Sequence, residues 1–223
     1  MKLVSLGGFC IAQNHIRKVR KQEGAASPFS RVLTKPDIVV DILNDDFKTF
    51  LNKDEYIYGA HPKTGVRVAW SADGARFSHS DFDTIPGEHE KLKSQCDYLR
   101  DCLSTKTGFG YLMIIYWHDY EYYKSSLVQI RKIIPEDCKL FVCAIRWYGN
   151  FGPTLTEDNI YYGGIELPEA NCIWWKKKNE YSKGITMKQD ERDPDNVREK
   201  VFSMAPYGIS PEYNEMVDKV FYQ

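Results

Sequence analysis

The chain has 223 residues, of which 43% are hydrophobic, and this length suits one large domain with a substantial apolar core. It carries 30 Lys plus Arg against 31 Asp plus Glu, a formal charge of -1, so it has no excess of positive charge to attract nucleic acid or an anionic membrane. We therefore expect a single α/β domain over residues 1–223 that binds neither nucleic acid nor membrane.

The N-terminal segment predicts a strand, a glycine turn and a helix. Residues 2–6 are mostly apolar and stop at Gly7 and Gly8, and residues 11–21 then place apolar side chains at helical spacing. A second helix is expected after Thr34, a candidate N-cap, with Pro36 near its first position. Its apolar positions continue as far as Leu51.

Residues 52–88 differ in kind from the segments around them. Aromatic and β-branched residues alternate there with glycines and prolines, a pattern typical of short strands and ordered loops. We expect a loop-rich, short-strand insertion that faces the substrate. Residues 89–103 then place Leu92, Cys96, Leu99 and Leu103 on one helical face, which predicts a helix that buries Cys96.

The clearest unit consists of two apolar runs, 111–117 and 140–147, separated by an amphipathic segment at 122–134. This pattern predicts two parallel strands buried on both faces and joined by a right-handed helical crossover. A short strand is expected at 173–175, and helices are expected after Asp193 and Ser210. The expected fold is α/β: a mainly parallel open sheet flanked by helices in three layers, with the insertion at 52–88.

The six cysteines form neither a CxxC pair nor a Cys/His zinc spacing, and the chain is too long for a disulfide scaffold. They are Cys10, Cys96, Cys102, Cys138, Cys143 and Cys172. We expect six free thiols in a cytoplasmic, reducing compartment. We expect no metal and no cofactor.

Candidate site residues follow the ends of the three predicted parallel strands, because ligands bind beyond the carboxyl ends of such strands. The first strand leads to Cys10, the second leads to His118 and Asp119, and the third ends at Arg146 and Trp147. We expect these side chains to converge on one edge of the sheet, with Arg146 and Trp147 as binding residues.

Cys10 follows the glycine turn at the start of a helix, where free N–H groups and the helix dipole favour the thiolate. The N–H groups of Gly7 and Gly8 are candidate oxyanion donors, and they are also candidates for contact with a phosphate. The alternative is that Cys10 is a buried packing residue, which is common for cysteine.

A family resemblance rests on three short segments: Ser5-Leu6-Gly7-Gly8-Phe9-Cys10, Ser27-Pro28-Phe29 and Phe77-Ser78-His79-Ser80-Asp81-Phe82. Together they resemble a bacterial and viral domain family of unknown function that is described as papain-like cysteine peptidases, with the pattern S-L-G-x-x-C, S-P-F-D-W and H-D-F. The resemblance covers roughly the first 85 residues and, more loosely, the strand pair at 111–147.

The resemblance implies that Cys10 is the nucleophile, His79 the base and Asp81 a partner of that histidine. The chain departs from the family pattern at two places: Ser30-Arg31 stands where the family tends to have Asp-Trp, and Ser80 is inserted before Asp81. A papain-like nucleophile heads a long helix without a preceding strand, whereas here a strand precedes the cysteine. We follow the strand-first interpretation for the fold.

His118, with Asp119 beside it, is the competing base, because it directly follows an apolar strand. His15 lies inside the apolar arc of the first helix and is expected to be a core histidine with its hydrogen bonds satisfied. His61 and His89 are expected on the surface.

These patterns predict a thiol-dependent hydrolase or acyltransferase that acts on a small-molecule, glycan or peptide substrate. The alternative is a noncatalytic protein of surface-polysaccharide metabolism that binds a sugar nucleotide or a glycan. Aromatic residues make up 14% of the chain and cluster in pairs, which favours a sugar ligand if the rings line a cleft.

Overall fold

The structure of the chain is a computed structural model. It describes residues 1–8, 12–13, 15–22, 26–60, 67–77, 82–83, 85–105, 107–116, 120–146, 151–166 and 211–223. The strand expected at 173–175 and the helix expected after Asp193 lie outside the described residues. Among the described helices, none has the length and apolar character needed to cross a membrane.

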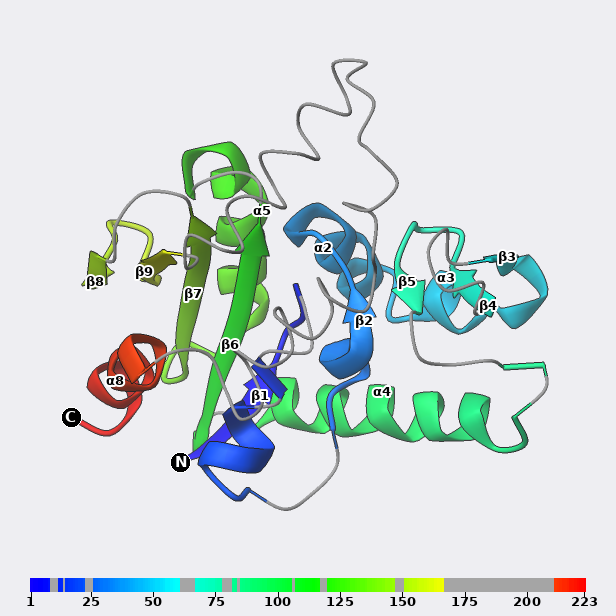
Figure 1. Cartoon of the computed structure of the whole chain (residues 1–223), viewed down its shortest axis with the longest axis horizontal. Helices are drawn as coiled ribbons and strands as arrows, with labels where there is room; N and C mark the ends of the chain where they lie inside the picture. Colours follow the sequence, from blue (N-terminus) through cyan, green and yellow to red (C-terminus); the bar gives the residue numbers. More distant parts are fainter. Residues whose placement is uncertain are drawn as a thin grey trace, which may run out of the picture.

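A five-stranded sheet, sheet A, forms one half of the fold (Figure 1). Its strands, in spatial order, are β1 (Lys2–Ser5), β6 (Phe109–Tyr116), β7 (Lys139–Arg146), β9 (Tyr161–Glu166) and β8 (Phe151–Leu155). The first four run parallel and β8 is antiparallel to β9. The α5 helix (Tyr120–Ile133) connects β6 to β7, which confirms the predicted pair of parallel strands with a helix between them.

Apolar side chains cover both faces of sheet A, as expected for strands whose sequence is almost continuously apolar. Successive strand residues point to opposite faces of the sheet, so odd- and even-numbered residues of one strand belong to two separate apolar clusters. Tyr111, Met113 and Ile115 of β6 join the cluster that includes α2, α4 and α5, whereas Leu112 and Ile114 join the cluster that includes α8.

A second, four-stranded sheet, sheet B, is antiparallel. Its strands, in spatial order, are β2 (Val32–Leu33), β5 (Arg76–Phe77), β4 (Arg67–Trp70) and β3 (Ile57–Ala60). Residues of sheet B, such as Val32 and Phe77, belong to the same apolar cluster as Val4 and Met113 of sheet A. The two sheets therefore share one core. The fold is α/β, with a mixed and mostly parallel sheet beside a small antiparallel one.

The helices between β2 and β6 begin with α2 (Pro36–Asn44), whose first turn holds Pro36 as predicted. The N-cap is Lys35 and not Thr34, because the Thr34 hydroxyl contacts the glycine turn instead. Asp46 and Phe47 have positive φ values, which end α2, and the short α3 (Lys48–Leu51) and a 3-10 turn (Lys53–Glu55) follow. The second helix therefore ends at Asn44, and the apolar positions as far as Leu51 belong to a separate helix.

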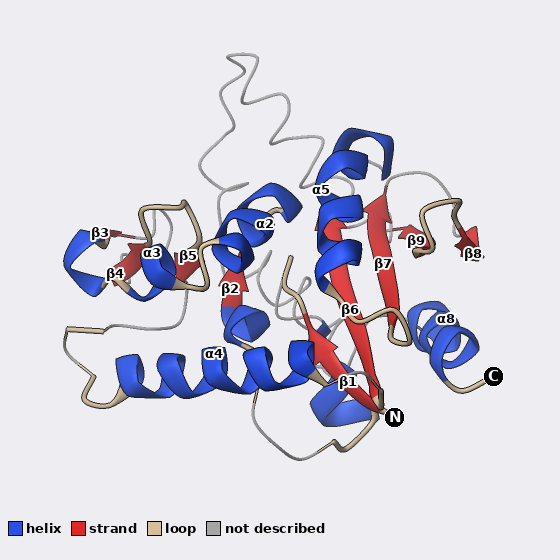
Figure 2. Ribbon diagram, turned by 180° about the vertical axis from the view of Figure 1, so that it is seen from behind, coloured by secondary structure: helices blue, strands red, loops and turns tan. Residues whose placement is uncertain are grey.

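The α4 helix (Glu88–Ser104) matches the predicted helix at 89–103 and runs from below sheet B towards β1 in Figures 1 and 2. It buries Leu92, Cys96 and Leu99 as predicted. The N-terminal helical segment includes a π-helical turn (His15–Val19), and it packs with α8 (Pro211–Phe221) in the second apolar cluster. The α8 helix confirms the helix predicted after Ser210.

Candidate functional site

The turn that follows β1 is made by Gly7 and Gly8, which have φ values of 95° and 88°. The main-chain N–H of Ile114 on β6 donates to the Gly7 carbonyl at 3.1 Å, so the turn remains attached to sheet A after β1 ends. A Cβ on Gly8 would lie 2.6 Å from the carbonyl carbon of Ile114 and closer still to its oxygen. Glycine is therefore required at position 8 by both its backbone conformation and its crowding.

Both glycine N–H groups have acceptors inside the protein. The N–H of Gly7 donates to the Ser5 hydroxyl, and the N–H of Gly8 donates to the Thr34 hydroxyl, each at 3.3 Å. Ser5 and Thr34 are buried. An oxyanion or a phosphate would have to compete for the same two N–H donors. These contacts therefore support a role for the two glycines in forming the turn.

The segment Ser27-Pro28-Phe29 packs directly on this turn. Ser27 caps a short 3-10 helix (Pro28–Arg31) by accepting a hydrogen bond from the Phe29 N–H, and Phe29 is fully buried. The Cβ of Phe29 lies 3.1 Å from where a Cβ on Gly7 would be. Two of the three segments that carry the family resemblance are thus in contact.

The third segment joins them through a chain of aromatic rings. The ring centroid of Phe29 lies 5.8 Å from that of Phe50, and Phe50 lies 5.2 Å from Phe77. Phe77 and Phe82 are 4.8 Å apart with their rings perpendicular, a favourable edge-to-face arrangement. Each of the three segments therefore contributes to one apolar cluster, through Leu6, Phe29, Phe77 and Phe82.

All predicted catalytic residues lie outside the described residues, as does the predicted binding residue Trp147; the catalytic ones are Cys10, His79, Asp81, His118 and Asp119. Arg146 is the last residue of β7 and its backbone lies opposite Glu166 of β9. The structure does describe the elements that lead to both candidate bases. The strand β5 ends at Phe77, two residues before His79, and β6 ends at Tyr116, two residues before His118.

The four cysteines that the structure describes are core residues. Cys96, Cys102, Cys138 and Cys143 are at most 2% exposed. Burial raises the pKa of Cys96 to about 12 and also raises the pKa values of Cys102 and Cys143, because a thiolate is poorly solvated in an apolar core. Cys96, Cys102 and Cys143 are therefore protonated and unreactive at neutral pH.

Two histidines have structural positions. His15 is fully buried, as predicted, with its Nδ1 atom 2.7 Å from the side-chain oxygen of Asn214 on α8. Burial lowers the pKa of His15 to about 4, so the ring is neutral at physiological pH. His89 was expected on the surface, but it is buried at the start of α4, where its Nε2 atom lies 2.9 Å from the Leu51 carbonyl.

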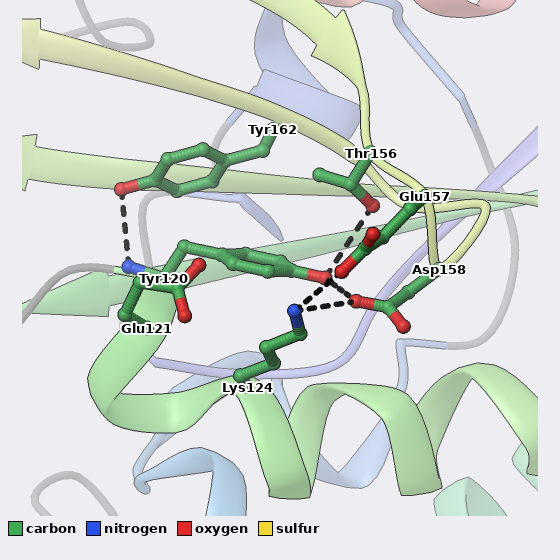
Figure 3. A pocket seen from close by; sticks show the side chains of 7 residues that line it. All are labelled: Tyr120, Glu121, Lys124, Thr156, Glu157, Asp158 and Tyr162. Carbon is green, nitrogen blue, oxygen red and sulfur yellow. Dashed lines mark hydrogen bonds and ion pairs between the residues drawn. The ribbon is translucent and has the colours of Figure 1, made fainter.

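A cavity of about 440 Å³ lies between the start of α5 and the turn that joins β8 to β9 (Figure 3). It is lined by Tyr120, Glu121, Lys124, Thr156, Glu157, Asp158 and Tyr162. Sequence patterns did not predict this site. Tyr120 belongs to one of the aromatic clusters in the sequence, but the charged residues look like ordinary surface positions.

No group of three or more His, Cys, Asp or Glu side chains suited to a metal ion occurs among the described residues. Neither a family model, nor a curated protein, nor a solved structure matches the chain. The resemblance to the papain-like family therefore stays a prediction, carried by the three segments alone.

Proposed function

We propose that this protein is a thiol-dependent hydrolase or acyltransferase in which Cys10 is the nucleophile and a histidine is the base. The observation that carries the proposal is the set of contacts around the Gly7-Gly8 turn, which leads to Cys10 two residues later. The strand β6, which leads to His118, contacts this turn directly. The strand β5, which leads to His79, is connected to the turn through its paired strand β2. Such a turn lies at the carboxyl end of a parallel strand, where α/β proteins place their sites.

The first of these elements is β5, which leads to His79. It pairs with β2 through Val32 and Phe77, and Thr34, two residues after Val32, accepts the hydrogen bond from Gly8. The second is β6, which leads to His118 and whose Ile114 donates to Gly7. Both arrangements support a histidine near the residues that follow the turn.

We assign the base to His79 with Asp81 as its partner because the family resemblance favours it, whereas the contacts of β5 and β6 support both histidines. His118 with Asp119 is the alternative base, and Arg146 and Trp147 are proposed to bind the substrate.

Helices on the two faces of sheet A are proposed as the outer layers of a three-layer fold, and residues 52–88 as an insertion that faces the substrate. A cytoplasmic location agrees with a thiol nucleophile, which must stay reduced.

In the proposed reaction the histidine takes the proton of the Cys10 thiol, and the thiolate attacks a substrate carbonyl carbon. A carbon–sulfur bond forms while the carbonyl π electrons move to the oxygen. The leaving group then departs with the proton that the histidine returns, which gives a thioester. Water or an acceptor nucleophile cleaves this thioester and restores the thiol. Because Gly7 and Gly8 already donate to Ser5 and Thr34, the oxyanion donors are proposed to be N–H groups that follow Gly8.

The test is the rate at which iodoacetamide labels each cysteine of the native protein at pH 6, followed by peptide mass spectrometry. The four buried cysteines form a slow background, and Cys172, the other cysteine that lies outside the described residues, is the internal reference. An activated Cys10 should react about tenfold or more faster than Cys172, because each unit by which the pKa falls raises the thiolate fraction tenfold at this pH.

Variants of the two histidines identify the base. His79→Ala should slow the labelling of Cys10 and shift its pH profile upward, whereas His118→Ala should leave both unchanged. The reverse result would move the base to His118. Equal labelling rates for Cys10 and Cys172 in the native protein would refute the thiolate proposal itself.

A further inference from the structure

Hydrogen bonds connect the two walls of the cavity between α5 and the β8–β9 turn. The turn is closed by the Thr156 N–H, which donates to the Ile160 carbonyl at 2.9 Å, and by the Ile160 N–H, which donates back to the Thr156 hydroxyl at 3.3 Å. At the far end of α5, Arg131 donates to the Asn159 carbonyl at 3.1 Å. The turn, which forms one wall of the cavity, is therefore hydrogen-bonded both internally and to α5, which forms the other wall.

Tyr120 holds the inner end of the cavity together. Its hydroxyl donates to the Asp158 carboxylate at 2.8 Å, and its N–H donates to the Tyr162 hydroxyl at 3.3 Å. The two rings lie 5.1 Å apart between centroids. Tyr120 is 6% exposed, and Tyr162 is partly buried between Tyr120 and Phe151, whose ring centroid lies 5.2 Å from its own, so Tyr162 supplies the more accessible part of the aromatic wall (Figure 3).

The charges of the cavity decide which ligands suit it. Glu121, Glu157 and Asp158 face a single cation, Lys124, so three negative charges and one positive charge give a formal charge of -2. Phosphates, nucleotides and carboxylates are therefore repelled. The Lys124 ammonium lies 2.7 Å from Glu157 and 3.8 Å from Asp158, so a cationic ligand would meet a like charge beside the carboxylates it needs.

A neutral ligand with several hydroxyl groups avoids both conflicts. Its hydroxyls can donate to the carboxylate oxygens of Glu157 and Asp158 and accept from Lys124, and its C–H face can pack on an aromatic ring. Sites for small ligands have volumes of about 300–1,000 Å³, and 440 Å³ lies in the lower part of that range. We propose that this cavity binds a neutral monosaccharide unit, independently of the reaction proposed at Cys10.

The experiment titrates the full chain with glucose, galactose, mannose and N-acetylglucosamine, each to about 50 mM, a range that covers millimolar affinities. Binding is followed by saturation-transfer NMR on the sugar. At least one of these sugars should bind, and a matching disaccharide tests whether the unit is recognised free or as part of a longer glycan. Glucose 6-phosphate should bind more weakly than glucose if charge selects the ligand.

Two variants test the location of the binding site. Glu157 is 79% exposed, so Glu157→Ala leaves the fold intact and should weaken binding by about tenfold through loss of a charged hydrogen-bond acceptor. Glu215→Ala removes an exposed carboxylate on α8, outside the cavity, and should change nothing. Tyr162→Leu, which keeps apolar volume but removes the ring, should also weaken binding, with Tyr122→Leu as the control on the exposed side of α5.

The proposal is overturned if none of the four sugars binds, if Glu157→Ala and Glu215→Ala bind equally well, or if a simple amine such as butylamine binds and the sugars do not. Cys10→Ala should bind the sugar with unchanged affinity, so this proposal and the thiol proposal can fail separately.

Discussion

Replacement of Gly8 by alanine tests how strongly the turn after β1 depends on its close approach to β6. The backbone at Gly8 has a φ of 88°, and a Cβ there would lie 2.6 Å from the Ile114 carbonyl carbon. Non-bonded carbon atoms normally lie about 3.5–4.0 Å apart. The turn and β6 would therefore have to separate by at least roughly 1 Å, because the Cβ would lie closer still to the Ile114 oxygen.

The cost has two parts. A left-handed backbone costs an alanine about 1–2 kcal/mol relative to glycine. The separation also weakens two hydrogen bonds, Ile114 N–H to the Gly7 carbonyl and Gly8 N–H to the Thr34 hydroxyl, each worth about 1 kcal/mol. We expect Gly8→Ala to lower the free energy of unfolding by about 3–4 kcal/mol.

Gly108→Ala is the matched control. Gly108 also has a φ of 88°, but no atom lies within 4 Å of the position of its Cβ. It should therefore lose only the backbone part, about 1–2 kcal/mol. The measurement is urea unfolding followed by circular dichroism. Equal losses in the two variants would refute the argument that crowding by β6 requires glycine at position 8.

Three further variants test other contacts by the same unfolding measurement. Gln22 both donates to and accepts from the Leu3 backbone on the open edge of β1, so Gln22→Ala should cost about 1–3 kcal/mol, and no loss would mean that water replaces it equally well. Arg131 is 8% exposed and donates to four main-chain carbonyls, so Arg131→Met should cost about 2–4 kcal/mol while the exposed Lys132→Met costs almost nothing. Burial lowers the pKa of His15 from 6.5 to about 4, so the folded state binds fewer protons than the unfolded one. Stability should be fully present above pH 6.5 and fall by about 3 kcal/mol towards pH 4, and His15→Gln should flatten that slope.

Sequence patterns predicted the elements whose apolar residues face a core. The helices α4, α5 and α8 and the strands β6 and β7 all occur within about two residues of the predicted ranges. Burial enforces this periodicity, because a polar residue on the inner face would lose its hydrogen bonds with water. Cys96 is one result: its spacing on the α4 face predicted a buried thiol, and it is buried.

The strands β8 and β9 were missed because their sequence resembles a loop. The middle of β9 is Gly163-Gly164, and glycine pairs usually indicate a turn. In the structure, other side chains fill the space above them: a Cβ on Gly163 would lie 2.8 Å from the sulfur of Met216, and one on Gly164 would overlap the ring of Phe151. This reason for glycine depends on packing partners that are distant in sequence, so no local pattern could reveal it.

The same limit applies to the cavity beside α5. Lys124 and Glu157 are 33 residues apart, and each one alone looks like a solvated charge. Only the β8–β9 hairpin brings the Thr156–Asp158 turn to the flank of α5. A site made of polar residues from two elements has no periodicity of its own, whereas the glycine turn after β1 was found because its residues are consecutive.

The described residues of the three segments that carry the family resemblance have structural roles, so stability measurements and cysteine labelling test different parts of the resemblance. Phe29, Phe77 and Phe82 are core residues, so a fold alone explains their presence in the three segments. Cys10 follows the turn by two residues in the sequence, and its role is the one that labelling tests. Phe29→Leu should therefore lower stability without changing the pH profile of Cys10 labelling, whereas His79→Ala should change the profile without a large loss of stability. If both variants altered only stability, the three segments would be a packing motif and the thiol chemistry would have no remaining support.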